Sequence, residues 1–202
     1  GRSLMTLTAA RSLNEHGIDV IACDSVNMTA SNFSKHVSDH FIYTPYEDDE
    51  EQFIADLLEN IKRFKPADGE DYVLMPMFRD TRIIAKHKDV LEQHIIVATP
   101  DTNSIEKIHP KDHFAQTCKT FGINAPHTIA PQTSDDLNKA LTAREITLPA
   151  LIKPVDNVGG RGIVFTKTEK ELINAFENHV EKQGEAPLVQ EAIDGDDYCL
   201  SV

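Results

Sequence analysis

Lys153 is the side chain whose position in this sequence is hardest to explain by packing alone. It lies in the apolar run of residues 150–155, on the same face as Leu151 and Val155 by the two-residue period of a strand. A lysine is rarely buried without a partner, because removing the ammonium from water is costly. An edge strand from which the side chain reaches solvent, a core carboxylate or an anionic ligand would each explain it. The residues that follow Lys153 favour the ligand.

A glycine-rich run begins four residues after Lys153. Gly159, Gly160 and Gly162 let the backbone approach a ligand closely and turn successive N–H groups toward one point, which suits anionic oxygens. Arg161 adds a cation that can reach the same oxygens. A hairpin turn would explain the glycines alone, but a lysine on the entering strand followed by this loop indicates phosphate binding. The loop is not a Walker motif, since neither GxxxxGKS nor GxxxxGKT occurs.

Hydrophobic periodicity predicts two kinds of architecture along the chain. Apolar runs that predict strands and amphipathic stretches that predict helices alternate through about residue 100, which indicates a parallel sheet covered on both faces. From Pro110 the pattern changes to hairpin strands, helices between strands and a tight glycine connection, as in a small α+β unit. We expect the boundary between Thr99 and Lys111. The predicted strands are residues 18–23, 41–44, 72–75, 95–98, 128–129, 150–155, 163–165 and 188–193, and the predicted helices lie around residues 4–13, 53–64, 83–91, 110–121, 134–144 and 168–180.

Composition narrows the class of protein. The chain has 202 residues, of which 40% are hydrophobic and 26% charged, as in a folded soluble protein. Its net charge of −13 makes nucleic acid and membrane surfaces poor partners. Three well-separated cysteines fit a reducing, cytoplasmic setting. Because the sequence begins without Met and ends within a predicted strand, we expect a piece of a longer polypeptide.

Taken in order, four segments resemble the ATP-grasp superfamily, in particular its carbamoyl-phosphate-synthase-like and biotin-carboxylase-like carboxylate ligases. Residues 110–126 resemble the first ATP-lysine segment, in which Gly122 follows Lys111 at a spacing of 11 positions. Residues 151–154 resemble the second ATP-lysine strand, residues 158–162 the glycine loop, and residues 188–198 the adenine hinge.

The resemblance implies an α/β fold with two domains. Residues 1–105 would form a Rossmann-like, parallel-sheet pre-ATP-grasp domain that lacks its first strand. Residues 106–202 would form the N-terminal part of the ATP-grasp domain, with a small α+β lid subdomain at about 127–190. The start of the second lobe would follow, truncated after the hinge.

The resemblance also assigns roles to residues. Lys111 and Lys153 would bind the ATP phosphates, and Arg161 and the glycine-loop amides would cover them. The hinge would bind adenine, through the backbone of Glu191 and Ile193 and the side chain of Gln190. Asp197 would hold the ribose hydroxyls. The implied ATP-binding residues are Lys111, Lys153, Gly159, Gly160, Arg161, Gly162, Gln190, Glu191, Ala192, Ile193 and Asp197.

The implied activity is that of a ligase which uses ATP to activate a small-molecule carboxylate as an acyl phosphate, for attack by an amine or similar nucleophile. The implied Mg²⁺ ligands lie beyond residue 202, so we expect neither metal-binding nor catalytic residues within this chain. We therefore expect it to be inactive alone. The resemblance also allows a homodimer of the full-length protein. Acceptor and nucleophile are not specified by the sequence.

Two other functions stay open at this stage. The first hundred residues could be the NAD(P)-binding Rossmann domain of an oxidoreductase, with Asp24 at a strand end to hold ribose hydroxyls. The module could instead bind nucleotides without catalysis. A zinc site at His36 and His40, four residues apart, is disfavoured because no third ligand is evident.

Overall fold

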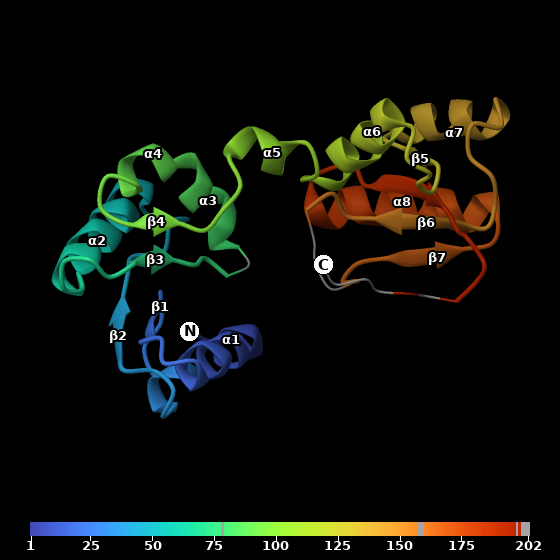
Figure 1. Ribbon diagram of the computed structural model, residues 1–202. Coiled ribbons are helices and arrows are strands. Elements are labelled where there is room, and N and C mark those ends of the chain that lie inside the picture. Colours follow the sequence, from blue (N-terminus) through green and yellow to red (C-terminus); the bar gives the residue numbers. More distant parts are fainter. Residues whose placement is uncertain (78, 157–159, 197, 199–202) are drawn as a thin grey trace. The chain divides into compact units, whose positions relative to one another are not determined.

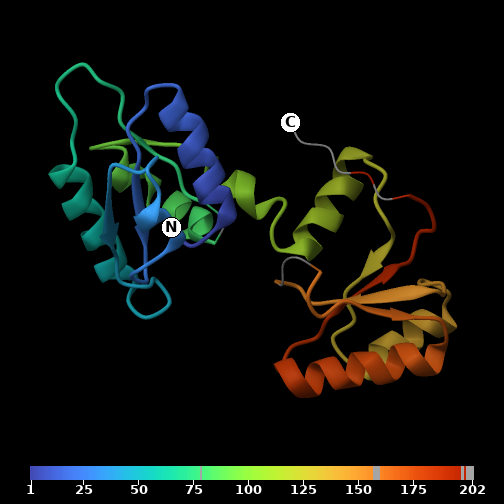
Figure 2. The same ribbon diagram turned by 90° about the horizontal axis from the view of Figure 1, so that it is seen from below.

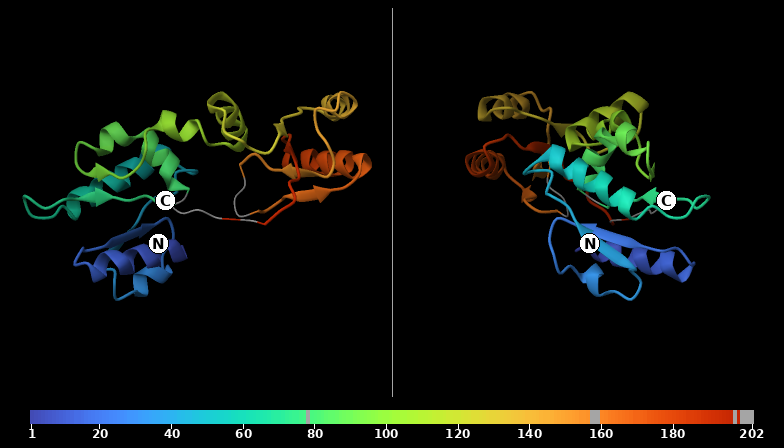
Figure 3. Two further views of the ribbon diagram at one scale, coloured as in Figure 1. Left: turned by 45° about the vertical axis from the view of Figure 1, so that its right-hand side comes forward. Right: turned by 90° about the vertical axis from the view of Figure 1, so that its left-hand side faces the viewer.

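The chain divides into two units, Gly1–Thr102 and Asn103–Val202 (Figure 1 and Figure 3). Each unit is built around its own hydrophobic core. The computed structural model describes residues 1–77, 79–156, 160–196 and 198. Within these ranges no helix combines the length and the apolar character that crossing a membrane requires.

The first unit contains short strands and helices in alternation. In Figure 2, α1 and α2 lie on opposite sides of the β1–β2 ladder. The elements in chain order are α1 (Leu4–Glu15), β1 (Ile21–Asp24), the 3₁₀ helix η1 (Ala30–Phe33), β2 (Asp39–Ile42), α2 (Glu50–Arg63), β3 (Val73–Leu74), α3 (Asp80–Lys86), α4 (Lys88–Leu91) and β4 (Ile96–Val97), followed by α5 (Thr102–Glu106) at the division between the units.

Helix α2 shows how the sequence specifies one of these elements. The Asp49 carboxylate caps the helix by accepting a hydrogen bond of 2.9 Å from the Gln52 N–H. Acidic residues follow in the first turn and basic ones in the last, where each favours the helix dipole. Phe53 and Leu57, one turn apart, are 0% and 1% exposed and anchor the helix in the core. The acidic run before the predicted helix therefore marks its start.

The expectation of one parallel sheet in this unit is only partly met. β1 pairs with β2 and β3 with β4, both in parallel, but the described residues place these ladders in two separate two-stranded sheets. The free edge of β1 is engaged elsewhere, because the Cys23 carbonyl accepts a hydrogen bond of 2.8 Å from the Gly1 amino nitrogen. β3 and β4 are only two residues long. The unit is α/β, but its strands do not join into the expected continuous sheet.

The second unit is a four-stranded antiparallel sheet with strand order β5-β8-β6-β7. Helices α7 and α8 pack together, and α8 contacts β6 and β7 on one face of this sheet. Helix α6 lies on the other side (Figure 2). The elements are α6 (Lys111–Phe121), β5 (Thr128–Ile129), α7 (Ser134–Thr142), β6 (Ala150–Lys153), β7 (Val164–Thr166), α8 (Glu169–Gln183) and β8 (Leu188–Glu191).

The core of the second unit follows the predicted patterns. Ala150 and Ile152, alternate residues of β6, are fully buried against Leu172 and Phe176 of α8. Thr168 caps the start of α8, because its hydroxyl accepts from the Glu171 N–H at 3.2 Å, and the Glu171 carboxylate accepts from the Lys167 N–H at 2.8 Å. This packing leaves the other residues of β6 facing away from α8.

Candidate functional site

The open face of the second sheet carries the predicted lysine. Strand register aligns Phe165, Leu151, Gln190 and Thr128 in one row across β7, β6, β8 and β5. Lys153 lies two residues after Leu151 and therefore on the same face. Leu151 and Lys153 are half-buried, whereas their neighbours Ala150 and Ile152 are buried against α8. The face is thus an apolar surface with one cation beside Gln190.

The Lys153 ammonium is held by a neutral side chain. Its Nζ donates to Oε1 of Gln190, and Nε2 of Gln190 donates to the Thr128 hydroxyl at 2.8 Å. The Thr128 hydroxyl in turn donates to the Pro126 carbonyl at 3.0 Å. Lys153 is therefore half-buried and, within the described ranges, is not paired with an acidic side chain. Full exposure or an acidic partner would each have explained the lysine without a ligand.

A second lysine approaches the end of the same strand. Lys111, the first residue of α6, donates from Nζ to the carbonyls of Pro154 at 3.0 Å and Val155 at 3.2 Å. Burial, and secondarily the positive charge of Lys111, lower the pKa of the Lys153 ammonium from its usual value. Two lysines far apart in sequence thus lie near the end of β6, close enough for the charge of one to affect the other, in an arrangement that an anion would stabilise.

The glycine loop follows β6 in the sequence, and residues 160–162 of it are described. Gly160 and Gly162 adopt φ values of 74° and 76°, in the left-handed region that glycine tolerates best. A Cβ at Gly160 would meet no atom within 4 Å, so open space lies beside the backbone. Arg161 is exposed and makes no hydrogen bond or ion pair with the described part of the chain. Gly159 lies outside the described residues.

In the hinge, some backbone N–H groups are hydrogen-bonded within the chain and another is open to a ligand. The Glu191 N–H donates to the His127 carbonyl, and the Ala192 N–H donates to the Pro149 carbonyl, each at 2.9 Å. Residue Ile193 is 69% exposed, and its backbone N–H makes no hydrogen bond within the described residues. A purine ring nitrogen could accept from it. Asp197, the expected ribose residue, lies outside the described residues.

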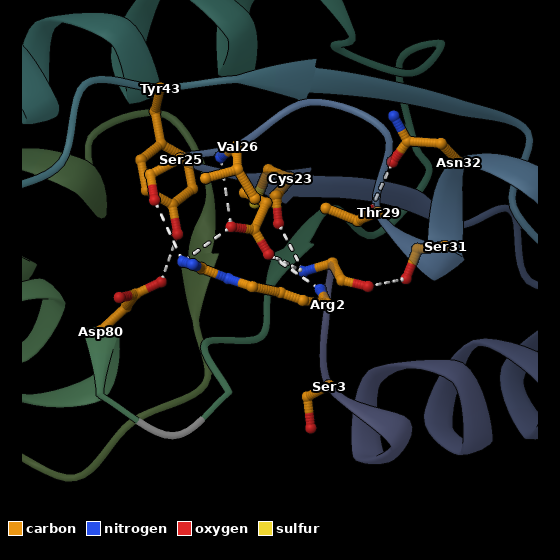
Figure 4. A network of polar contacts seen from close by, with 12 residues as sticks. Arg2, Ser3, Cys23, Ser25, Val26, Thr29, Ser31, Asn32, Tyr43 and Asp80 are labelled. Atoms are coloured by element: carbon orange, nitrogen blue, oxygen red, sulfur yellow. Dashed lines mark hydrogen bonds and ion pairs between the residues drawn. The ribbon is translucent and has the colours of Figure 1, made fainter.

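The first unit contains a separate polar network around Asp24 (Figure 4). One carboxylate oxygen accepts from the Arg2 backbone N–H at 2.8 Å and contacts the Gly1 amino nitrogen at 2.9 Å. The other contacts the Arg2 guanidinium at 2.9 Å. Burial alone would raise the pKa of Asp24, but these partners outweigh burial and lower it. Both oxygens are engaged, which counts against a role for Asp24 in holding ribose.

The structure gives no support for a metal centre in the described ranges. No group of three or more His, Cys, Asp or Glu side chains there could hold an ion. His36 contacts the Asn14 side chain at 3.1 Å, and His40 lies in β2.

Sequence reasoning did not identify Thr128 as part of the site. Its strand was predicted, but its position opposite Gln190 depends on the pairing of β5 with β8, which are far apart in the chain. A polar residue in a two-residue strand gives no local signal of such a contact.

The site joins a lysine on the open face of an antiparallel sheet, a glycine loop after that strand and a second lysine from a preceding helix. The fold, this arrangement and the comparisons with known proteins together indicate the ATP-grasp superfamily.

Within that superfamily, residues 110–193 match the family "Carbamoyl-phosphate synthase L chain, ATP binding domain". The carbamoyl phosphate synthase large chain of Clostridium beijerinckii is 24% identical over 179 residues, which cover 89% of this chain and 15% of the relative. Residues 110–193 are therefore similar to the ATP-binding domain of carbamoyl-phosphate-synthase-like enzymes.

Solved structures share the fold of both units. A biotin carboxylase–β,γ-ATP complex from Campylobacter jejuni has a TM-score of 0.70 at 17% identity, covering 96% of this chain and 44% of that chain. The biotin carboxylase domain dimer of Hydrogenobacter thermophilus 2-oxoglutarate carboxylase, with MgADP, ADP and bicarbonate, has a TM-score of 0.69 at 20% identity. It covers 96% of this chain and 43% of that one. The chain thus spans less than half the length of these relatives.

Proposed function

We propose that this chain is the ATP-binding portion of an ATP-grasp carboxylate ligase. The full-length enzyme would activate a small-molecule carboxylate as an acyl phosphate, which an amine or similar nucleophile then attacks. The observation that carries this proposal is that Lys111 and Lys153 both lie near the end of β6, where the Lys153 ammonium contacts only a neutral side chain among the described residues. The match of residues 110–193 to an ATP-binding domain family supports ATP as the anion that they bind.

In this proposal the phosphate tail lies between the two lysines and the glycine loop. Lys111 and Lys153 bind phosphate oxygens, and backbone N–H groups of Gly159, Gly160 and Gly162 cover the β- and γ-phosphates. Arg161 reaches the same oxygens. The open space beside Gly160 and the absence of a partner for Arg161 in the described structure fit this role.

The adenine is proposed to lie on the apolar open face beside the hinge. The N–H of Ile193 would donate to a ring nitrogen, the Glu191 backbone would complete the contact with the base edge, and Ala192 would line it. Asp197 is proposed to hold the ribose hydroxyls. Leu151 and the Lys153 side-chain carbons supply apolar surface for the purine.

Magnesium bound with ATP would neutralise charge during phosphoryl transfer. We propose that its ligands lie beyond residue 202 and that this chain alone is inactive. A homodimer of the full-length protein is also part of the proposal, because the Hydrogenobacter thermophilus relative is a dimer.

Calorimetric titration with ATP tests the proposal. We expect measurable binding to the unmodified chain and none to Lys153→Ala, because the variant loses a phosphate-binding cation. Lys170→Ala, which removes an exposed lysine of α8, is the matched control and should bind like the unmodified chain.

Equal ATP affinity of the unmodified chain and Lys153→Ala would overturn the proposal. Thermal shifts measured with ATP and with NAD separate it from a dinucleotide-binding function, since only ATP should raise the unfolding temperature.

A further inference from the structure

The Gln190 side chain has a fixed orientation in the folded chain. The Thr128 hydroxyl has a single hydrogen, which it donates to the Pro126 carbonyl. That hydroxyl can therefore only accept from Gln190, and it does so from Nε2 at 2.8 Å. The carbonyl oxygen of the Gln190 amide must then face Lys153, whose ammonium it accepts from. We call Lys153, Gln190 and Thr128 together the amide clamp.

In the amide clamp, Lys153 contacts a neutral acceptor although a carboxylate, that of Glu191, is present at the next position in the sequence. Glu191 follows Gln190, but its carboxylate turns to the His127 backbone N–H at 2.7 Å instead. A carboxylate at position 190 would also accept from Lys153, and it would cancel the ammonium charge. The amide gives Lys153 a hydrogen bond and leaves its charge uncompensated.

Because Lys153 is partly buried, its ammonium needs a hydrogen-bond acceptor within the protein. Lys153 is half-buried, and its pKa is lowered by burial and by Lys111. An ammonium in this setting needs an acceptor to remain in one place, because an unsatisfied donor is costly away from water. Gln190 supplies that acceptor from the neighbouring strand, in the row directly beside the lysine.

We propose that Gln190 is a positioning residue that acts through Lys153. Its amide holds the ammonium on the nucleotide-facing side of the sheet, Thr128 fixes the amide, and because the amide is neutral the lysine charge remains available for the phosphates. This inference rests on the proposed ATP site. It differs from the expectation that the Gln190 side chain reads the adenine amino group, because here the side chain serves the phosphate end of the nucleotide.

Positioning of Lys153 and contact with adenine, the two roles considered for Gln190, predict different losses of affinity for ATP and for adenosine. Gln190→Glu keeps an acceptor for Lys153 but neutralises its charge, so ATP affinity should fall by at least about tenfold while adenosine affinity changes by less than about twofold. Gln190→Met and Thr128→Val remove hydrogen bonds of the clamp while keeping a similar side-chain size. Both variants should also weaken the binding of ATP more than the binding of adenosine. Gln183→Glu, an exposed position at the end of α8, makes the same change of charge and should leave both affinities unaltered.

Affinities are measured by calorimetry and by ligand competition on the full 202-residue chain. An equal loss of ATP and adenosine affinity in Gln190→Glu would overturn the inference and favour contact of the Gln190 side chain with the base. Unchanged ATP affinity in Gln190→Glu would also overturn the inference. Circular dichroism and thermal unfolding establish that each variant is folded.

NMR of the lysine ammonium groups, without nucleotide, tests the clamp separately from the proposed function. The Lys153 signal should move in Gln190→Met and in Thr128→Val and stay in place in Gln183→Glu. If it moves but the unmodified chain binds no ATP, the proposed function fails while the clamp stands as a structural contact, and the inferred role in nucleotide binding is overturned. An unmoved signal overturns the clamp itself, whatever nucleotide binds.

Discussion

A charged side chain inside a fold can be stabilised by an opposite charge or by a neutral hydrogen-bond partner, and this chain uses both. Asp24 contacts the cationic guanidinium of Arg2, which compensates its charge. Lys153 instead contacts the amide of Gln190, so its charge is available to a ligand. A compensated ion stabilises a local structure, whereas an uncompensated one favours binding of an opposite charge.

Asp80 provides a prediction at the same scale. Its carboxylate accepts a hydrogen bond from the Tyr43 hydroxyl, and burial raises the pKa of Asp80 despite that bond. In the unfolded chain Asp80 has its usual pKa of 3.8, so as pH rises it ionises at a lower pH in the unfolded chain than in the folded chain. Its contribution to stability is therefore greatest below the unfolded pKa and is lost as pH rises through the folded pKa.

Asp80→Asn removes this ionisation and keeps an oxygen that can accept from Tyr43. We expect the variant to unfold at a higher temperature than the unmodified chain near neutral pH, and the difference to vanish in acid below the unfolded pKa. Thermal unfolding across this range checks it, with Asp68→Asn at an exposed loop position as the control. A lower unfolding temperature at neutral pH would show that the folded chain stabilises the charged form.

At the scale of elements, helix α8 supports the sheet that carries Lys153. Its buried residues Leu172 and Phe176 pack against Ala150 and Ile152 of β6, so the alternate side chains of β6 are directed to the open face. The position of the lysine thus depends on a helix that makes no contribution of its own to the proposed site.

The cap of this helix can be tested with a single substitution. Thr168→Ala removes the hydroxyl that accepts from the Glu171 N–H, and we expect a loss of about 1 kcal/mol in the free energy of unfolding. Urea unfolding measures it. Thr142→Ala, at the exposed last residue of α7, makes the same chemical change away from a cap and should cost less. Equal losses in the two variants would contradict a capping role for Thr168.

Local patterns predicted the elements better than their partners. The caps and apolar spacing of α2 and α8 are local, so their positions followed from the sequence. The stretch 83–91 was expected as one helix, but α3 ends at Lys86 and α4 begins at Lys88, with His87 between them contacting Glu50 of α2 at 2.8 Å. That contact joins residues 37 positions apart, beyond the reach of periodicity.

The same limit applies to the site. Lys153 and the glycine loop are close in sequence and were recognised together. The contact between Gln190 and Lys153 depends on the register of β6 with β8, and that between Gln190 and Thr128 on the register of β5 with β8. Strand order and register are set by tertiary packing, so the side-chain clamp could not be predicted from residue types.

At the scale of the whole molecule, the two units have separate cores with different tasks in the proposal. The proposed ATP-binding residues all belong to the second unit, Asn103–Val202. The first unit contains the core around Phe53 and Leu57 and the polar network of Asp24. A change in one core should therefore affect nucleotide binding only if it lies in the second unit.

Two buried phenylalanines allow a matched test of this division. Phe53 of α2 is 0% exposed and Phe176 of α8 is 1% exposed, so replacing either by alanine should cost about 3–5 kcal/mol in its own unit. We expect Phe53→Ala to speed amide hydrogen exchange in α2 and leave ATP affinity unchanged. Phe176→Ala should speed exchange in α8 and weaken ATP binding, because the sheet under Lys153 loses its support. Faster exchange in α8 of Phe53→Ala, or an equal loss of ATP affinity in both variants, would mean that the two cores unfold as one and that the site depends on the entire chain.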